Sequence, residues 1–332
     1  MNVARQLIRA RARFVIFAAC AICCAVLGSS GRAHAEKVLI GSTPTGHLMW
    51  IADKKGYFDA NGVDVKLLEF SSGVTASKAL ASGEIDLANS SEFAFVSNLL
   101  ANRGLKLVAS IARANSATLF ARRDRGIAHV GDLPGKKIGV TRRGIGEFFL
   151  GEYLAINGIV KEDVTLVDLR APDIVDAIAG GRIDAAITWE PFVYKSQTAL
   201  GDKFVQLPEQ DSYYYHFVLA GKETWLETHR SDMRGILRGL IDAEQYAAEY
   251  PQEAQQIIAE RFRLELGFVR ETWTKYIREV TIQQNLISLM EREAQWLIEG
   301  GRADTGGAMD FLAVVDSEPL SDVAPDAVKL IK

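Results

Sequence analysis

The sequence predicts an α/β protein built from two similar halves, because stretches of the chain recur at a fixed distance. Residues 79–88 (Ala-Leu-Ala-Ser-Gly-Glu-Ile-Asp-Leu-Ala) match residues 177–186 (Ala-Ile-Ala-Gly-Gly-Arg-Ile-Asp-Ala-Ala). Residues 40–46 and 138–144 match with the same offset of 98 positions. A third match, between Tyr57–Val63 and Tyr153–Ile159, has an offset of 96. Chance likeness between two ordinary α/β units is the alternative to duplication, and three matches favour duplication with a cleft between the halves.

In the first half, short apolar runs alternate with segments of helical periodicity. Glycines near the ends of the helical segments supply termination signals. This pattern predicts strands at 37–42, 63–70, 85–88 and 106–111, with helices at 47–58, 74–81 and 92–102.

The second half repeats the order, and further helical segments follow it. We expect strands at 137–140, 164–169 and 183–187, and helices at 146–155 and 174–179. Alternating strands and helices predict mainly parallel sheets that are covered on both faces. Residues 223–300 carry a helical signal, with Leu237, Leu240, Ile241, Ala247 and Ala248 on an apolar stripe that Glu244 interrupts, and residues from 314 onward suggest an extended tail.

The first 35 residues have the layout of a cleaved export signal. Arginines at 5, 9, 11 and 13 form a basic front, residues 14–27 are apolar, and Ala33-His34-Ala35 is a small-x-small cleavage site. A membrane anchor is the alternative, but this apolar run is shorter than the ~20 residues that a spanning helix needs. A lipidated Cys20 is a lesser alternative, because the preceding residues match a lipoprotein cleavage box poorly.

Removal of this segment changes the chemistry that the chain can perform. All three cysteines, at 20, 23 and 24, lie within it, so the remaining 297 residues can form no disulfide and use no thiolate. They carry 33 basic and 42 acidic side chains, a net charge of −9. A surface this acidic argues against nucleic acid as a partner. A length near 300 residues suggests about two domains.

Polar residues follow the predicted strands at the positions where α/β sheets bind ligands, outside the carboxyl ends of the strands. These positions are 42–44, 71–73, 89–91 and 188–191. Hydroxyl-rich loops that run into helix N-termini offer backbone N–H groups and a positive dipole end to an anion. The alternative is that each hydroxyl only caps its own helix.

Motifs for catalysis or for cofactor binding are missing from the sequence. Residues 131–137 superficially resemble a phosphate loop, but the spacing of the glycines is wrong and Lys137 occupies the Ser/Thr position. No G-x-S-x-G motif occurs, and the histidines are dispersed. We therefore expect neither an enzyme nor a bound cofactor or metal.

Several of these segments together resemble a known family. They are Gly56-Tyr-Phe-Asp-Ala-Asn-Gly-Val63, Gly83-Glu-Ile-Asp86, Asp132-Leu-Pro-Gly-Lys-Lys-Ile-Gly-Val140, Gly181-Arg-Ile-Asp-Ala185 and Trp189-Glu-Pro191, with Glu147 in the helix between them. The chain resembles the substrate-binding proteins of nitrate/sulfonate/taurine ABC importers over nearly all of its mature length. This resemblance implies the two-lobed type II fold of periplasmic binding proteins, with two crossing strands and hinge closure.

The resemblance also implies an organisation and a set of partners. We expect a signal peptide at 1–35, the first part of lobe 1 at 36–120, lobe 2 at 121–216, and the return strand with C-terminal helices at 217–332. The protein would be a periplasmic monomer that captures a small anionic or zwitterionic solute and delivers it to an ABC permease and ATPase. A sulfonate, taurine, nitrate or a carboxylate is the expected ligand.

For several candidate site residues, the sequence leaves two roles open. Trp189 would line the cleft or pack in the core. Arg142 would face inward as the best anion partner or outward in a basic run. Glu190 would receive an ammonium group or cap the next helix, whereas a structural role is favoured for both His47 and His216. The full predicted set is Ser42, Thr43, Pro44, His47, Ser71, Gly73, Ser90, Ser91, Glu92, Thr118, Arg142, Gly144, Glu147, Thr188, Trp189, Glu190 and His216, and Tyr213, Tyr214 and Tyr215 are candidates to close the mouth.

Two other functions stay possible. Enzymes of thiamine-pyrimidine synthesis and desulfination have similar folds, but these relatives depend on cysteine, which the mature chain does not contain. A periplasmic sensor that reports to a membrane receptor would have the same sequence features as an importer component.

Overall fold

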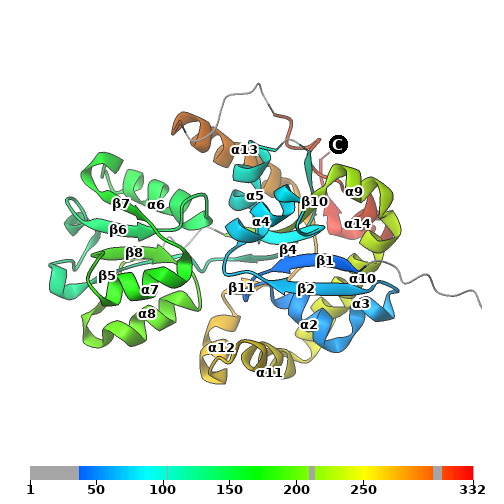
Figure 1. Cartoon of the computed structure of the whole chain (residues 1–332), viewed down its shortest axis with the longest axis horizontal. Helices are drawn as coiled ribbons and strands as arrows, with labels where there is room; N and C mark the ends of the chain where they lie inside the picture. Colours follow the sequence, from blue (N-terminus) through cyan, green and yellow to red (C-terminus); the bar gives the residue numbers. More distant parts are fainter. Residues whose placement is uncertain (1–36, 103, 209–213, 302–308, 332) are drawn as a thin grey trace, which may run out of the picture. The chain divides into compact units, whose positions relative to one another are not determined.

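The structure is a computed structural model that describes residues 37–102, 104–208, 214–301 and 309–331. The predicted signal peptide, its cleavage site and Tyr213 lie outside the described residues. Two main sheets organise residues 37–332, and both consist of strands with helices on their two faces (Figure 1).

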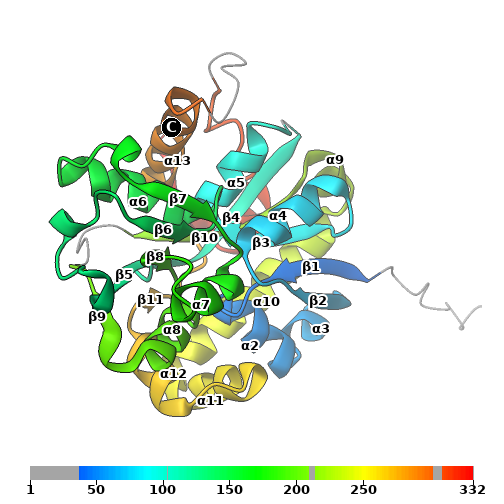
Figure 2. The same cartoon turned by 60° about the vertical axis from the view of Figure 1, so that its left-hand side comes forward.

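The first sheet has six strands in the order β11-β4-β10-β3-β1-β2. Strands β1, β2 and β3 pair in parallel, whereas β10 pairs antiparallel with both β3 and β4. Helices α4 and α5 cover one face of this sheet, and α2, α3 and α10 cover the other (Figures 1 and 2). The elements are β1 (Val38–Ser42), α2 (His47–Lys55), α3 (Tyr57–Ala60), β2 (Val65–Glu69), α4 (Gly73–Ser82), β3 (Leu87–Ser91), α5 (Glu92–Leu99), β4 (Leu105–Ala114), β10 (Tyr215–Lys222) and β11 (Tyr276–Ile277).

The second sheet has five strands in the order β7-β6-β8-β5-β9. Strands β6, β7 and β8 pair in parallel, and β5 runs antiparallel between β8 and β9. In Figure 1, α6 lies on one face of this sheet and α7 and α8 lie on the other. The elements are β5 (Thr118–Arg122), β6 (Lys137–Val140), α6 (Ile145–Ile156), β7 (Thr165–Asp168), α7 (Ala171–Ala179), β8 (Ala185–Thr188), α8 (Phe192–Leu200) and β9 (Phe204–Gln206).

The two sheets share one topology, because β2-β1-β3-β10-β4 and β7-β6-β8-β5-β9 have the same order and the same strand directions. The chain passes to the second sheet between β4 and β5, and it returns between β9 and β10. The predicted α/β fold, with two sheets flanked by helices, is confirmed.

The residues that recur in the sequence perform the same tasks in both sheets. The backbone N–H of Leu39 donates to Asp86 Oδ2 at 2.8 Å, and that of Lys137 donates to Asp184 Oδ2 at 2.9 Å. Each aspartate thus joins the start of one strand to the turn before the next. The repeat thus preserves the same hydrogen bond from a strand N–H to an aspartate, although this bond is partly buried in the first sheet and exposed in the second.

The repeated glycines have an equally specific reason. A Cβ atom on Gly41 would lie 2.6 Å from Ile85 Cδ1, and one on Gly139 would lie 2.5 Å from Ile183 Cδ1. In each half, the isoleucine before the aspartate therefore packs directly over a strand glycine. The motif Ile-Asp together with a glycine at an earlier strand position encodes this packing twice.

Three local expectations were wrong. The helix expected at 47–58 is divided, because Gly56 adopts the left-handed conformation (φ 70°) that ends α2 before α3 begins. The expected loop at 89–91 belongs to β3, since these residues pair with β10 from a distant part of the sequence. The helix expected to reach 102 ends at Leu99.

The C-terminal part of the chain adds helices α9 (Glu223–Thr228), α10 (Arg230–Glu249), α11 (Pro251–Phe262), α12 (Leu266–Trp273) and α13 (Gln284–Glu299). Of the stripe predicted in α10, Leu237, Leu240 and Ala247 are buried, but Ala248 is exposed. Glu244 interrupts the stripe because its carboxylate accepts a hydrogen bond from the Val280 N–H at 2.8 Å.

The tail that follows is not wholly extended. It contains α14 (Glu318–Val323), which packs on α10 and whose second residue is a proline, a residue favoured in the first turn of a helix. A small parallel pair of β12 (Ile282–Gln283) and β13 (Val328–Lys329) ties the tail to the start of α13. Within the described residues, no helix combines the length and the apolarity needed to cross a membrane.

Candidate functional site

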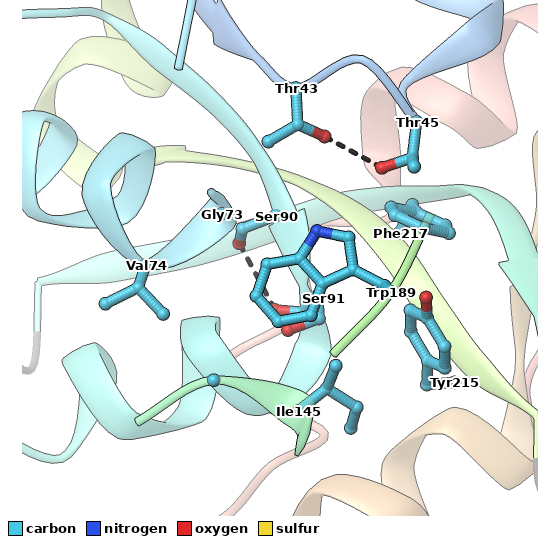
Figure 3. Close-up of a pocket in the computed structure, with 11 residues that line it drawn as sticks. Thr43, Thr45, Gly73, Val74, Ser90, Ser91, Ile145, Trp189, Tyr215 and Phe217 are labelled. Carbon is cyan, nitrogen blue, oxygen red and sulfur yellow. Dashed lines mark hydrogen bonds between the residues drawn. The ribbon is translucent and has the colours of Figure 1, made fainter. Parts of the chain in front are cut away.

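Residues from both sheets and their loops line one pocket. In the view of Figure 3, the Trp189 ring lies centrally among these residues, with Val74 and Ser90 on one side and Tyr215 and Phe217 on the other. None of the lining residues has a charged side chain. They are Thr43, Thr45, Gly73, Val74, Ser90, Ser91, Gly144, Ile145, Trp189, Tyr215 and Phe217.

The loop after β1 contributes a pair of hydroxyl groups. Thr43 Oγ1 and Thr45 Oγ1 lie 2.9 Å apart, and the Trp50 indole N–H donates to the Thr43 carbonyl at 2.7 Å, which fixes the loop. Ser42 lies behind this loop and donates to Asn89 Oδ1 at 3.3 Å. Ser42 is thus a buried support of the pocket and does not line it.

Three helices begin at the pocket. Helix α4 begins at Gly73, α5 follows Ser91, and α6 begins at Ile145 after Gly144. The first N–H groups of a helix have no partner within the helix, and the helix dipole favours negative charge there. Hydrogen-bond donors and three positive dipole ends therefore surround a pocket that contains no charged side chain.

Ser91 both caps its own helix and lines the pocket, the two roles that the sequence left open for these hydroxyl groups. Its hydroxyl accepts a hydrogen bond from the Ala94 N–H at 3.2 Å, as an N-cap, and Ser91 also lines the pocket. In the Ser71–Gly73 loop, Ser72 is the cap of α4, Ser71 lines no pocket wall, and Gly73 does. A Cβ on Gly73 would lie 2.9 Å from Ser90, so the close approach of these two segments requires glycine.

The second sheet contributes Trp189, which follows β8. Its ring is half-buried, packs against the core and lies edge-on to Phe192 at a centroid distance of 6.4 Å. Glu190 caps helix α8, since its Oε2 accepts a hydrogen bond from the Tyr194 N–H at 3.1 Å. Trp189 therefore serves the pocket and the core together, and Glu190 faces a neighbouring cavity with Pro44 and His47.

Strand β10 brings Tyr215 and Phe217 into the pocket wall. The Tyr215 hydroxyl is 2.6 Å from Ser116 Oγ, which holds the ring in place. Tyr215 was among the tyrosines expected near the mouth, whereas Tyr214 is exposed. Sequence reasoning missed Phe217, although its spacing of two from Tyr215 on a strand places both rings on one face. It also missed Thr45, Val74 and Ile145, which are immediate neighbours of predicted residues.

Several predicted residues lie outside the pocket lining. Arg142 is exposed and its N–H donates to Asp168 Oδ1 at 3.2 Å, so the expected anion partner is not brought to the site. Glu147 accepts from the Arg143 N–H at 2.8 Å and satisfies the start of α6. Thr118 and Thr188 are buried opposite each other in strands β5 and β8.

Glu92 is fully buried directly behind Ser91 and forms a carboxyl pair with Glu293 of α13. Its Oε2 accepts a hydrogen bond from the His216 N–H at 2.9 Å. Glu92 Oε1 and both Glu293 oxygens are buried without a donor among the other described residues, which favours the protonated form of both carboxyl groups. Burial raises the pKa of Glu92 to about 8 and that of Glu293 well above its usual range.

The two predicted histidines are buried and neutral. Burial, helped by the charge of Arg113, lowers the pKa of His216 to about 4, and its Nδ1 lies 2.9 Å from Ser110 Oγ. Burial, with a contribution from Arg278, lowers the pKa of His47 well below its usual value. His47 stacks on Trp273 at 5.3 Å. These contacts agree with the structural roles favoured for both residues.

The chain is similar in sequence to binding proteins from other bacteria. A Bacillus subtilis relative that is named as an aliphatic sulfonates-binding protein is 25% identical to this chain over 243 residues. The match covers 71% of this chain and 73% of the relative. The taurine-binding periplasmic protein of Escherichia coli is 33% identical over 135 residues, covering 40% and 41% of the two chains.

A solved structure extends the likeness to the fold. The alkanesulfonate-binding protein SsuA from Xanthomonas axonopodis pv. citri, bound to MOPS, has a TM-score of 0.74 and 17% identity, covering 85% of this chain and 99% of SsuA. The sequence profile of the family described as NMT1/THI5 like matches residues 45–254, which is more than half of the chain. Because this match covers more than half of the chain, the chain belongs to the NMT1/THI5-like family.

Proposed function

We propose that this protein is the solute-binding component of an ABC importer. It captures a small organic anion or zwitterion in the central pocket and presents it to a membrane permease. The observation that carries the proposal is the convergence of three helix N-termini and four Ser/Thr hydroxyls on one pocket lined by both sheets. Sulfonate, carboxylate and nitrate groups all accept hydrogen bonds from such donors.

The absence of Arg142 from the lining changes the mode of binding that we propose. The ligand's charge would be met by backbone N–H groups and hydroxyls rather than by a guanidinium. The Trp189 ring would cover the organic part of the ligand, since a large rigid ring with one polar edge suits this position. Closure around the ligand requires contacts that favour the closed state over the open one.

The compartment and the partners belong to the same proposal. Export by the predicted signal peptide would place a monomer in the periplasm, where it meets the permease and ATPase of the importer. Two lobes with boundaries near residues 120 and 216 fit this role, because β5 and β10 begin at these points. The named relatives are binding proteins, which supports capture without catalysis.

Isothermal titration calorimetry with ethanesulfonate, taurine, acetate and nitrate tests the proposal. We expect heat of binding with at least one of these anions or zwitterions. Thr43→Val should weaken that binding about tenfold because it removes a hydroxyl that lines the pocket, whereas Thr198→Val, on the exposed side of α8, should not. Binding of only neutral or cationic solutes would refute the anion assignment.

A sensor and an enzyme make different predictions. A sensor would bind the same ligand but would not stimulate the ATPase of a reconstituted importer. An enzyme would consume the ligand, which product analysis by mass spectrometry after prolonged incubation would detect. We expect stimulation of the ATPase and recovery of unchanged ligand.

A further inference from the structure

A cluster of three aromatic rings joins the two lobes beside the central pocket. Phe93 of α5 belongs to lobe 1, which contains the first sheet, and Phe148 of α6 belongs to lobe 2, which contains the second. Both rings are fully buried, and their centroids lie 5.4 Å apart. The Trp296 ring of α13 lies 5.4 Å from Phe148 and 5.8 Å from Phe93. Rings at these distances attract one another, so the cluster holds the lobes together.

Helix α13 brings Trp296 to lobe 2 because α6 has a glycine at the point of contact. Helix α13 packs on α5 of lobe 1, and Figure 2 shows it next to both α5 and α6. A Cβ atom on Gly151 of α6 would lie 2.6 Å from Trp296 Cζ2 and 3.1 Å from Cε2. Alanine suits the middle of a helix better than glycine does. The approach of Trp296, rather than the helix itself, therefore accounts for the glycine.

The core of lobe 2 is continuous with lobe 1 on this side alone. Phe148 of α6 and Ile138 of β6 belong to the same buried apolar cluster as Phe93 of lobe 1. On the other face of the second sheet, Phe120 and Ile174 belong to a separate cluster. Separation of the lobes would thus expose apolar surface along α6, which is unfavourable in water.

The aromatic cluster lies next to the pocket but outside its lining. Ser91, two residues before Phe93, and Ile145, three residues before Phe148, both line the pocket. A motion that separates these two walls of the pocket therefore separates the two rings. Further along, α6 and α13 border an open groove, which is lined on its two sides by Leu154 and Ala155 and by Glu299 and Gly300. The direct contact between the two helices is therefore small enough to be reversible.

We propose that the aromatic cluster is a latch that holds the two lobes closed in the absence of solute. Trp296 is then a positioning residue, which sets how often the lobes open. The inference rests on the proposed function, in which the lobes close around a solute. Without the latch, contacts with the solute would have to supply all of the preference for the closed form. With it, the closed form is populated beforehand, and the apparent affinity for the solute rises in proportion to that population.

Double electron–electron resonance between two spin labels measures the populations of the open and closed forms. Residues 36–332 contain no cysteine, so Lys78→Cys on α4 and Asp176→Cys on α7, both exposed, place one label on each lobe of the exported protein. Without solute, we expect a main distance equal to that in this structure and a minor second distance. Trp296→Ala should raise the ratio of the second population to the main one by about tenfold, because a ring contact between the lobes is lost.

Two glycine variants separate the contact from general effects on a helix. Gly151→Ala should also raise the ratio about tenfold, since the added methyl group collides with the Trp296 ring. Gly151→Ala combined with Trp296→Ala should open the lobes no further than Trp296→Ala does, because the methyl group then has room. Gly267→Ala adds the same group to α12 with nothing within 4 Å, and it should keep the wild-type ratio.

A matched tryptophan serves as the second control. Trp225 of α9 is half-buried and stacks on His229 within lobe 1, so Trp225→Ala should leave the ratio unchanged. Equal ratios in the wild type, Trp296→Ala and Gly151→Ala would overturn the latch, as would a wild type in which the second distance dominates. These measurements contain no solute. Failure of the latch would therefore leave the proposed function intact, and failure to bind any anion in calorimetry would leave the latch intact.

Discussion

The buried pair of Glu92 and Glu293 predicts that this protein loses stability as the pH rises above neutrality. Both carboxyl groups are fully buried, and their pKa values are raised because burial disfavours the charged form. In the unfolded chain both groups ionise near their ordinary pKa of about 4.5. The unfolded state therefore releases protons that the folded state holds, and alkaline conditions favour unfolding.

The size of the effect follows from the pKa of Glu92, which rises from 4.5 to about 8. Stability from this group is fully present below about pH 4.5 and declines up to about pH 8. Between pH 7 and pH 8 the free energy of unfolding should fall by about 1 kcal/mol from Glu92 alone, with a further loss from Glu293.

The histidines have the opposite effect in a lower range of pH. The pKa values of His47 and His216 are lowered, to about 4 for His216, so their contribution to stability is lost as the pH falls below about 6.5. Above pH 7 they are neutral in both states and contribute no slope. The interval from pH 7 to pH 8 thus isolates the raised carboxyl groups.

Urea denaturation at a series of pH values, followed by circular dichroism, measures this slope. The double variant Glu92→Gln/Glu293→Gln should lose most of it, since two amides can hydrogen-bond each other without ionising. Glu291→Gln, an exposed change on the same helix, should keep the wild-type slope. Equal slopes in the double variant and the wild type would refute the assignment of this slope to the buried pair.

Three further predictions concern the pocket and the repeat. Trp189→Ala should weaken ligand binding, measured by calorimetry, by about tenfold or more because the ring lines the pocket. It should lower the free energy of unfolding, measured by urea denaturation, by less than about 2 kcal/mol because the ring is only half-buried. Unaltered binding would make Trp189 a core residue. Gly139→Ala should destabilise by about 1 kcal/mol through contact with Ile183, and adding Ile183→Val should recover part of that loss; a further loss in the double variant would contradict this. Asp86→Ala should destabilise by about 1 kcal/mol in the same assay, and Asp184→Ala by less, because the first hydrogen bond is partly buried and the second is exposed; a larger cost for Asp184→Ala would contradict this.

Most of the scaffold could be predicted from the sequence because its signals are local. Strand β6 has the predicted bounds, and β7 and β8 differ from expectation by one or two residues. The failures have non-local causes. Residues 89–91 extend β3 because β10 pairs with them, and β10 lies more than 120 residues further along the chain. No local pattern around Ser90 contains that information.

The pocket was predictable only in part. Of the residues predicted to bind ligand, Thr43, Gly73, Ser90, Ser91, Gly144 and Trp189 line the pocket, since the ends of parallel strands bring these segments together. The sequence left open whether Arg142 faces inward or outward; in the structure, Arg143 beside it adopts a positive φ of 60° and Arg142 is exposed.

The duplication explains why the site lies where the two halves differ. Gly41 and Gly139, Ile85 and Ile183, and Asp86 and Asp184 repeat because each set maintains the same packing and the same hydrogen bond. The residues at the carboxyl ends of the equivalent strands are free of that constraint: Ser90 and Ser91, the last residues of β3, offer hydroxyls in one half, whereas Trp189 and Glu190, just after β8, offer a ring and a helix cap in the other. A pocket lined by two identical halves would present the same chemistry from both sides. The divergence of these segments gives one wall with hydroxyl groups and one with an aromatic ring, which fits the proposed capture of an asymmetric ligand with a charged head.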